Sequence, residues 1–138
     1  MGLISQNADL LPEFSTLENV ALPLLFDGVS RAEALEMGRE ALRRLELDHR
    51  AGAGVGTLSG GEEQRVAVAR AIGRKDVRLV IADEPTASLD VENARIVTGD
   101  LLRHAGDRGA SLIMATHDPA VAEHCDRIIR ISRGTAVA

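Results

Sequence analysis

Apolar side chains recur every three or four positions in the first third of the chain, which is the spacing of amphipathic α-helices. The first such stretch follows Thr16, a residue with good N-cap chemistry, and continues to about Leu25. Pro23 is expected to kink or shorten this helix, and Gly28 is expected to end it.

A second helix is predicted after Ser30, because Ser30 and Glu33 have the spacing of a capping box. Its apolar positions form one face, and the helix should run to about Leu47. Glycines at every second position from 52 to 56 predict a flexible loop over residues 48–57, and a third helix should begin at residues 59–60.

Short apolar runs replace this pattern in the second half of the chain, at Leu79–Ala82, Ala110–Ala115 and Ile128–Ile131. Such runs are typical of strands in a parallel sheet that is covered on both faces. Helical spacing from about Val91 to Ala105 lies between the first two runs and predicts a βαβ unit. Residues 1–5 have the pattern of a strand end, which we expect in the same sheet.

The end of the chain is predicted to form a short hairpin, in which residues 132–134 turn the last strand back along residues 135–137. The whole pattern predicts one α/β domain over residues 1–138. Its helical part should occupy about residues 15–72, and its parallel-sheet core should comprise residues 1–14 and 73–138.

The composition limits the cellular locations and the classes of partner that we expect for this chain. A net charge of −5 and an aromatic content of 1% provide neither a basic surface nor stacking residues, so no nucleic-acid partner is expected. The single cysteine, Cys125, cannot form an internal disulfide, and the N-terminus has no signal-peptide pattern. No apolar stretch approaches the roughly 18–20 residues of a membrane span. We therefore expect a cytoplasmic chain with an unreactive, half-buried thiol.

The sequence Ser59-Gly60-Gly61-Glu62 offers two interpretations. Ser59 and Glu62 can simply form a capping box around a tight helix entry. Two glycines at a helix start also leave the backbone N–H groups accessible, so that a phosphate can approach the positive end of the helix dipole. The second interpretation predicts an anion site.

Asp83 and Glu84 follow the predicted strand Leu79–Ala82 directly, at the edge of an α/β sheet where ligands bind. Adjacent carboxylates repel each other unless a cation or a hydrogen-bond donor compensates them. We expect Mg²⁺ here, with Asp83 as a water-mediated ligand and Glu84 orienting an attacking water.

His117 stands in the same position after the next strand, and Pro119 should begin a short helix behind it. A histidine at a strand end of this sheet is assigned a functional role. The other three histidines, His49, His104 and His124, are expected to be solvated in loops or on exposed helix faces.

Together these residues resemble the nucleotide-binding domain of ATP-binding-cassette (ABC) ATPases, in the order that the family has. Gln6 matches the Q-loop glutamine and His117 the switch histidine. Three longer motifs lie between them, the signature loop, the Walker B strand and the D-loop, at Leu58–Glu62, Leu79–Glu84 and Ser88–Asp90. The resemblance implies a P-loop NTPase-like ABC ATPase domain, present in part, with a helical subdomain and a parallel-sheet core.

The family resemblance also implies the partners and the nucleotide. Two such domains sandwich ATP with Mg²⁺, each nucleotide lying between one subunit's Walker A loop and the signature helix of the other. Ser59, Gly60, Gly61 and Glu62 would thus contact ATP held by the second ABC ATPase subunit. Asp90 would couple the two sites.

The remaining motif residues have roles by the same resemblance. Gln6 would sense the magnesium site, which includes Asp83, and would communicate with the transmembrane permease subunits. Glu84 would activate water, and His117 would contact the γ-phosphate. The chain would then lie on the inner face of the cell membrane through its permease. Residues 10–12 and 17–24, together with Glu62 where the wider family usually has Gln, look like the lipoprotein-release and macrolide-export branch.

The sequence departs from the family in one respect, because residues 1–138 contain no Gly-x-x-x-x-Gly-Lys-Ser/Thr loop. In the family that Walker A loop lies upstream of the Q-loop glutamine, so the chain matches a cassette truncated before its Q-loop. No ATPase activity is expected from these residues alone. The core strand Leu79–Ala82 is expected to lose a neighbour, which would expose a sheet edge and favour aggregation.

Three functions follow from these observations. The first is the ATP-binding and energy-coupling subunit of an ABC transporter. The second is a soluble cassette protein of DNA repair or translation, which predicts basic surface, long insertions or a tandem cassette. The third is a half-site partner that presents its signature helix to a complete cassette without hydrolysing ATP itself.

Overall fold

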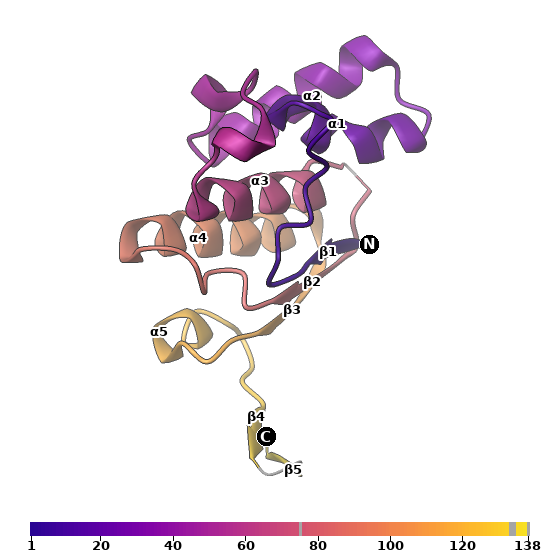
Figure 1. The fold of residues 1–138 in the computed structure, drawn as a ribbon. Coiled ribbons are helices and arrows are strands. Elements are labelled where there is room, and N and C mark those ends of the chain that lie inside the picture. The colour runs from indigo at the N-terminus through magenta and orange to yellow at the C-terminus, as the bar shows by residue number, and fades with distance from the viewer. Residues whose placement is uncertain (75, 133–134, 138) are drawn as a thin grey trace.

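The computed structural model describes residues 1–74, 76–132 and 135–137, arranged as two layers of helices over one face of a parallel sheet (Figure 1). The four long helices are α1 (Thr16–Phe26), α2 (Arg31–Arg44), α3 (Gly60–Ile72) and α4 (Val91–Arg108). Helix α3 contacts α1 and α2 on one side and β1 and α4 on the other. It therefore connects the outer helices to the sheet.

The sheet contains β1 (Gly2–Ile4), β2 (Leu79–Asp83) and β3 (Ser111–Ala115), all parallel and in the order β1-β2-β3. Ile4 lies opposite Ala82, and Asp83 lies opposite Ala115. This register brings the carboxyl ends of the strands, and the residues that follow them, to one edge of the sheet.

The hydrophobic core lies between the sheet and the helices. The buried strand residues Ile4, Val80 and Ala82 belong to the same cluster as Val66 and Val97 of α3 and α4. Glycine is required where β1 crosses α3, because a Cβ atom on Gly2 would lie 2.7 Å from the carbonyl oxygen of Ala71.

The ends of the first two helices differ from the sequence prediction. Ser15, not Thr16, is the N-cap of α1, because its side chain accepts a hydrogen bond from the Glu18 N–H. Pro23 lies within α1 and does not end it. Helix α2 begins after Ser30 as predicted but ends at Arg44, three residues early, because Glu46 takes a left-handed φ of 58°.

The region predicted as a flexible loop, residues 48–57, has regular structure. It contains two short 3₁₀ helices, η1 (Asp48–Arg50) and η2 (Val55–Thr57), and a bridge between Gly54 and Ser15. Hydrogen bonds from the Thr16 and Leu17 N–H groups to the Ala53 and Ala51 carbonyls attach this region to the start of α1.

The third apolar run does not join the parallel sheet. Residues 130–132 form β4 (Arg130–Ser132), which pairs antiparallel with β5 (Thr135–Val137) in a separate hairpin that follows α5 (Pro119–Ala122) (Figure 1). The two strands confirm the predicted hairpin; residues 133 and 134 of its turn lie outside the described residues.

The prediction that Leu79–Ala82 loses a neighbour is wrong, because β2 pairs with both β1 and β3. Within the described residues, the unpaired edges of this sheet belong to β1 and β3. No helix of the described chain has the length and apolar character needed to cross a membrane.

Candidate functional site

The signature segment forms the start of α3. The Ser59 side chain accepts a hydrogen bond from the Glu62 N–H at 3.2 Å, and the Glu62 carboxylate accepts one from the Ser59 N–H at 2.8 Å. The capping-box interpretation of this sequence is therefore correct. It does not exclude the anion site, because the box uses the amides of Ser59 and Glu62 and leaves those of Gly60 and Gly61 at the exposed helix start.

The two glycines of this segment differ in what they contact. A Cβ atom on Gly61 would lie 3.3 Å from Leu89 Cδ2, so packing against the D-loop favours a small residue there. A Cβ atom on Gly60 would meet no heavy atom within 4 Å. Packing within the chain therefore does not explain the glycine at position 60. Close approach of an external group, such as a phosphate, to the backbone at this position would explain it.

Glu62 is held by its own chain. Besides the Ser59 N–H, its carboxylate faces the Arg50 guanidinium, with 3.1 Å between Glu62 Oε1 and Arg50 Nε. The hydrogen bond from Ser59 and the charge of Arg50 lower the pKa of Glu62. Both oxygens are thus engaged inside the loop, and the side chain supports the signature segment from within.

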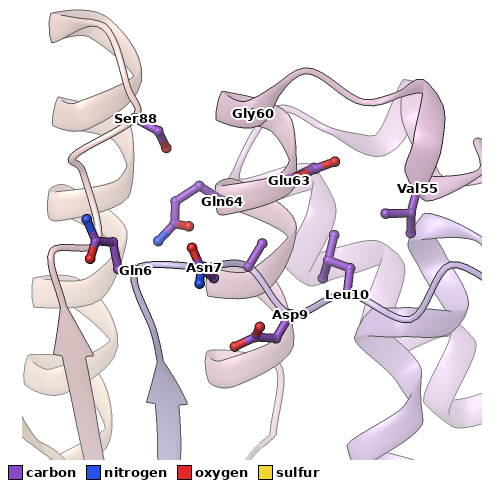
Figure 2. A pocket seen from close by; sticks show the side chains of 10 residues that line it. Gln6, Asn7, Asp9, Leu10, Val55, Gly60, Glu63, Gln64 and Ser88 are labelled. Carbon is purple, nitrogen blue, oxygen red and sulfur yellow. The ribbon is translucent and has the colours of Figure 1, made fainter.

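Gln6 lines a pocket of about 440 Å³ between the segment after β1, the start of α3 and the D-loop (Figure 2). Gly60 and Ser88 line the same pocket. The Q-loop, the signature segment and the D-loop, which are more than 25 residues apart in the sequence, therefore meet at this pocket. Asp9 and Glu63 also line the pocket and bring two carboxylates to it.

Side chains of α3 hold the backbone beside this pocket. The Arg70 guanidinium donates to the carbonyl oxygens of Ala8 and Asp9, each at 2.8 Å, and Gln64 Nε2 donates to the Ser5 carbonyl at 3.4 Å. The sequence reasoning missed both residues, since nothing in their spacing indicates a partner some 60 positions earlier. The segment that carries Gln6 is thereby attached to the signature helix.

Glu84 and His117 meet at the carboxyl edge of the sheet. Glu84 Oε1 lies 2.8 Å from His117 Nδ1, and Nδ1 carries the proton because an ionised carboxylate can only accept. The hydrogen bond to Glu84 and its negative charge raise the pKa of His117. The His117 ring is otherwise open, with 80% of its side chain exposed, so it can contact a ligand as well.

Asp83 is exposed at the end of β2. Gln6 comes shortly after β1, the strand that pairs with β2. Within the described residues, no three His, Cys, Asp or Glu side chains lie close enough to hold a metal ion by themselves. Asp83 and Gln6 offer the hard oxygen donors that Mg²⁺ prefers, and Mg²⁺ commonly takes only one or two protein ligands, with phosphates and waters completing its shell. The donor set fits that ion.

Asp90 is the N-cap of α4. Its carboxylate accepts hydrogen bonds from the Asn93 N–H at 2.9 Å and from Asn93 Nδ2 at 2.7 Å, and these bonds lower its pKa. The side chain is therefore used to fix the turn between the D-loop and α4.

His104 contradicts the expectation of a solvated side chain, because it is only 3% exposed. It lies on the buried face of α4 with Val97 and Leu101, and burial, followed by the charges of Arg108 and Arg44, lowers its pKa. The spacing of His104 from these two apolar residues was the available signal.

A family model described as ABC transporter matches residues 1–87, which include the Q-loop, signature and Walker B positions. The chain belongs to the ABC transporter family. The expected fold class is confirmed with it. The match ends before His117, whose place beside Glu84 comes from the tertiary structure.

Curated relatives of this ABC family chain include proteins named Lipoprotein-releasing system ATP-binding protein LolD. The protein from Hyphomonas neptunium is 42% identical over 137 residues, covering 99% of this chain and 60% of the relative. The protein from Geobacter metallireducens is 43% identical over 138 residues, covering 100% of this chain and 61% of the relative. The chain thus spans about three-fifths of these relatives, and the expected likeness to the lipoprotein-release branch is confirmed.

Solved ABC cassettes share the fold. The dimeric cassette MJ0796 in a post-hydrolysis state with ADP and Pi matches with a TM-score of 0.89 and 34% identity, over 96% of this chain and 59% of that one. A second dimeric structure of MJ0796, described as a bacterial ABC transporter cassette, gives a TM-score of 0.90.

Proposed function

We propose that this chain is part of the ATP-binding, energy-coupling subunit of an ABC transporter, in which two cassettes hold ATP between them. The observation that carries the proposal is the 2.8 Å contact between Glu84 and His117 at the carboxyl edge of the sheet. The names of the curated relatives and the dimers of the solved cassettes support it.

Glu84 is the general base of the proposed reaction. Its carboxylate accepts a proton from the water whose oxygen attacks the γ-phosphorus, and the bond from that phosphorus to the bridging oxygen breaks as ADP leaves. His117 orients Glu84 through Nδ1, while its exposed ring reaches the γ-phosphate.

The signature segment acts on ATP that the partner subunit holds. The Ser59 hydroxyl and the free amides of Gly60 and Gly61 donate to phosphate oxygens at the positive end of α3. Asp90 caps α4 and so fixes the turn after the D-loop. Gly61 packs against Leu89 of the D-loop, and this packing fixes the position of the signature segment relative to the D-loop.

Asp83 and Gln6 are the proposed Mg²⁺ ligands. When bound, the ion supplies positive charge that neutralises the phosphate oxygens. Because Arg70 and Gln64 attach the Gln6 segment to α3, a change at Gln6 reaches the signature helix directly.

We propose lipoprotein release as the process, with transmembrane permease subunits as partners and the cytoplasmic face of the membrane as the location. The shared name of the curated relatives supports this choice. A nucleic-acid function in repair or translation is disfavoured by the net charge of −5.

A half-site role is the second candidate, and the observation that favours it is the exposed start of α3, where a Cβ atom on Gly60 would meet no heavy atom of the chain within 4 Å. In that role the chain presents Ser59, Gly60 and Gly61 to ATP bound by a complete cassette. Both candidates require the signature segment to recognise nucleotide in trans.

The test is nucleotide-dependent association. Residues 1–138 are mixed with the complete Geobacter metallireducens relative, whose own catalytic carboxylate is replaced by an amide so that ATP is not consumed. Sedimentation is then measured with ATP and Mg²⁺ and with ADP. We expect a heterodimer with ATP only, and no ATP hydrolysis by residues 1–138 alone.

Gly60→Asp provides the decisive variant. A Cβ atom there would meet no heavy atom of this chain within 4 Å, so the fold should survive while the carboxylate repels phosphate. Gly106→Asp on α4 is the matched control, since a Cβ atom on Gly106 also meets nothing within 4 Å. Association that survives Gly60→Asp, or that never occurs with the wild-type chain, would overturn the proposal.

A further inference from the structure

Arg50 lies at the end of η1, eight residues before the signature segment, and reaches it with two groups. Its Nη2 donates to the Thr57 carbonyl at 2.6 Å, and its Nε lies 3.1 Å from Glu62 Oε1. Thr57 precedes the Leu58–Gly61 segment and Glu62 follows it, so one guanidinium joins both ends of that segment.

The pairing is partly shielded from water. The Arg50 side chain is 28% exposed and the Glu62 side chain is 19% exposed, which reduces the screening that weakens ion pairs on open surface. Glu62 uses its other oxygen, Oε2, to accept the Ser59 N–H. Arg50 therefore acts on Ser59 through Glu62.

The backbone that follows Arg50 is itself fixed. The Ala51 carbonyl accepts the Leu17 N–H at 2.9 Å, and the Ala53 carbonyl accepts the Thr16 N–H at 2.9 Å and the Thr16 hydroxyl at 3.0 Å. The start of α1 thus holds the segment that presents Arg50, and the guanidinium comes from a rigid support.

We propose that Arg50 is a positioning residue that holds Leu58–Gly61 in the conformation that presents Ser59, Gly60 and Gly61 to a nucleotide phosphate. The inference rests on the proposed function of the signature segment. Arg50 itself does not touch the nucleotide; it limits the conformations of the loop before nucleotide arrives, and so lowers the entropic cost of binding.

The role needs arginine in particular. A guanidinium spreads its charge over three nitrogens, so Nη2 can donate to Thr57 while the charge at Nε faces the Glu62 carboxylate, whereas a lysine ammonium is a single point charge on a flexible stem. Arg50→Lys keeps the charge and loses the second contact. It should therefore fail to restore the loop.

The first experiment uses the association with the complete cassette in ATP and Mg²⁺. Arg50→Met should weaken it roughly tenfold or more, the loss typical of charge-assisted hydrogen bonds, and Arg50→Lys should recover only part of it. Arg39→Met, at an exposed position on α2, is the matched control with the same change of charge and should bind like the wild-type chain.

A double-mutant cycle with Glu62→Gln distinguishes positioning from general destabilisation. Glutamine keeps an oxygen that can accept the Ser59 N–H but loses the ion pair, so Arg50→Met should cost less in that background than in the wild-type chain, because only the hydrogen bond to Thr57 remains to be lost. Fully additive effects of the two substitutions would overturn the inference, as would wild-type association in Arg50→Met.

The second measurement does not depend on the partner. Hydrogen exchange at the Ser59 and Glu62 amides reports the capping box directly, and Arg50→Met should lose protection there while Arg39→Met keeps it. If the wild-type chain never associates, the proposed function fails and exchange alone decides the role of Arg50. Unchanged exchange at both amides would refute it.

Discussion

At the scale of single residues, Glu84 shows how the site is held. Its φ is 48°, a left-handed value that a non-glycine residue adopts only when its surroundings impose it. The Glu84 N–H donates to the Ala115 carbonyl at 2.9 Å, which continues the pairing of β2 and β3 by one residue. That bond and the turn after it direct the carboxylate toward His117.

Glu84→Gln should lower the pKa of His117 toward the ordinary histidine value, because the amide removes the negative charge that favours the imidazolium. In the wild-type chain the raised pKa means that this pairing stabilises the fold at low pH and is lost as the pH rises through the pKa of folded His117. Nuclear magnetic resonance titration of His117 measures the change. Glu36→Gln on α2 removes an equal charge and should leave the titration unaltered.

His104 should make the chain less stable at acidic pH. Burial lowers the pKa of His104 in the folded chain. The stability that the neutral, buried ring contributes is therefore complete above the ordinary histidine pKa, and it is lost as the pH falls through that value toward the pKa of folded His104. The buried carboxyl of Asp100, whose pKa is raised by burial, acts in the opposite direction.

Comparison with His104→Gln isolates the histidine contribution. The free energy of unfolding should fall more steeply in the wild-type chain than in the variant between about pH 7.5 and about pH 5, the window in which an ordinary histidine titrates. Urea unfolding at several pH values measures it. Parallel curves for the two proteins would show that His104 is not the cause.

At the scale of elements, capping residues next to each helix determine where it starts, and packing against distant segments determines what each helix holds in place. Ser15, Ser30, Ser59 and Asp90 each cap the helix that follows, through a bond to the residue three positions on. Helix α3 then combines these local signals with long-range contacts, since it carries the signature segment at its start and holds the Gln6 segment along its side.

Ser15→Ala should destabilise the chain by about 1 kcal/mol, the usual cost of removing an N-cap hydroxyl. The capping box at Ser15 and Glu18 also begins the helix that holds residues 51–53, so the loss should appear in global unfolding. Chemical denaturation measures the difference. Ser15→Thr keeps the hydroxyl and should lose much less; equal losses in both variants would argue against the capping role.

At the scale of the whole molecule, the two faces of the sheet differ. Helices α3 and α4 cover one face (Figure 1). On the other face Leu3 is 59% exposed and Ile113 is 58% exposed, and they lie on either side of Ile81. Parallel sheets are normally covered on both faces. The described chain therefore presents an apolar sheet face beside the unpaired edge of β3.

Residues 1–138 expressed alone should self-associate through this face, and Ile113→Thr should increase the monomer fraction because it removes apolar surface while keeping β-branching. Sedimentation velocity over a concentration series measures the change. Val91→Thr is the matched control at a residue that is 71% exposed on α4. Equal behaviour of the two variants would show that association proceeds elsewhere.

The family motifs, the order of the strands and long helices, and the capped helix starts after Ser30 and Ser59 could all be predicted from the sequence. These features depend on hydrogen bonds between residues a few positions apart or on short apolar runs, and both are visible along the chain. Prediction erred by a residue at the start of α1, where Ser15 and Thr16 are chemically alike.

Which distant groups meet became visible in the folded chain. The tertiary structure placed Glu84 beside His117, 33 positions away, joined Arg50 to Glu62, buried His104 and gave β2 two neighbours. These outcomes depend on strand register and on how helices pack, in which many weak contacts between remote segments act together. The motif residues of the site could be predicted along the chain, but the contacts between them depend on the fold; of these outcomes, only the burial of His104 had a local signal, its spacing from Val97 and Leu101.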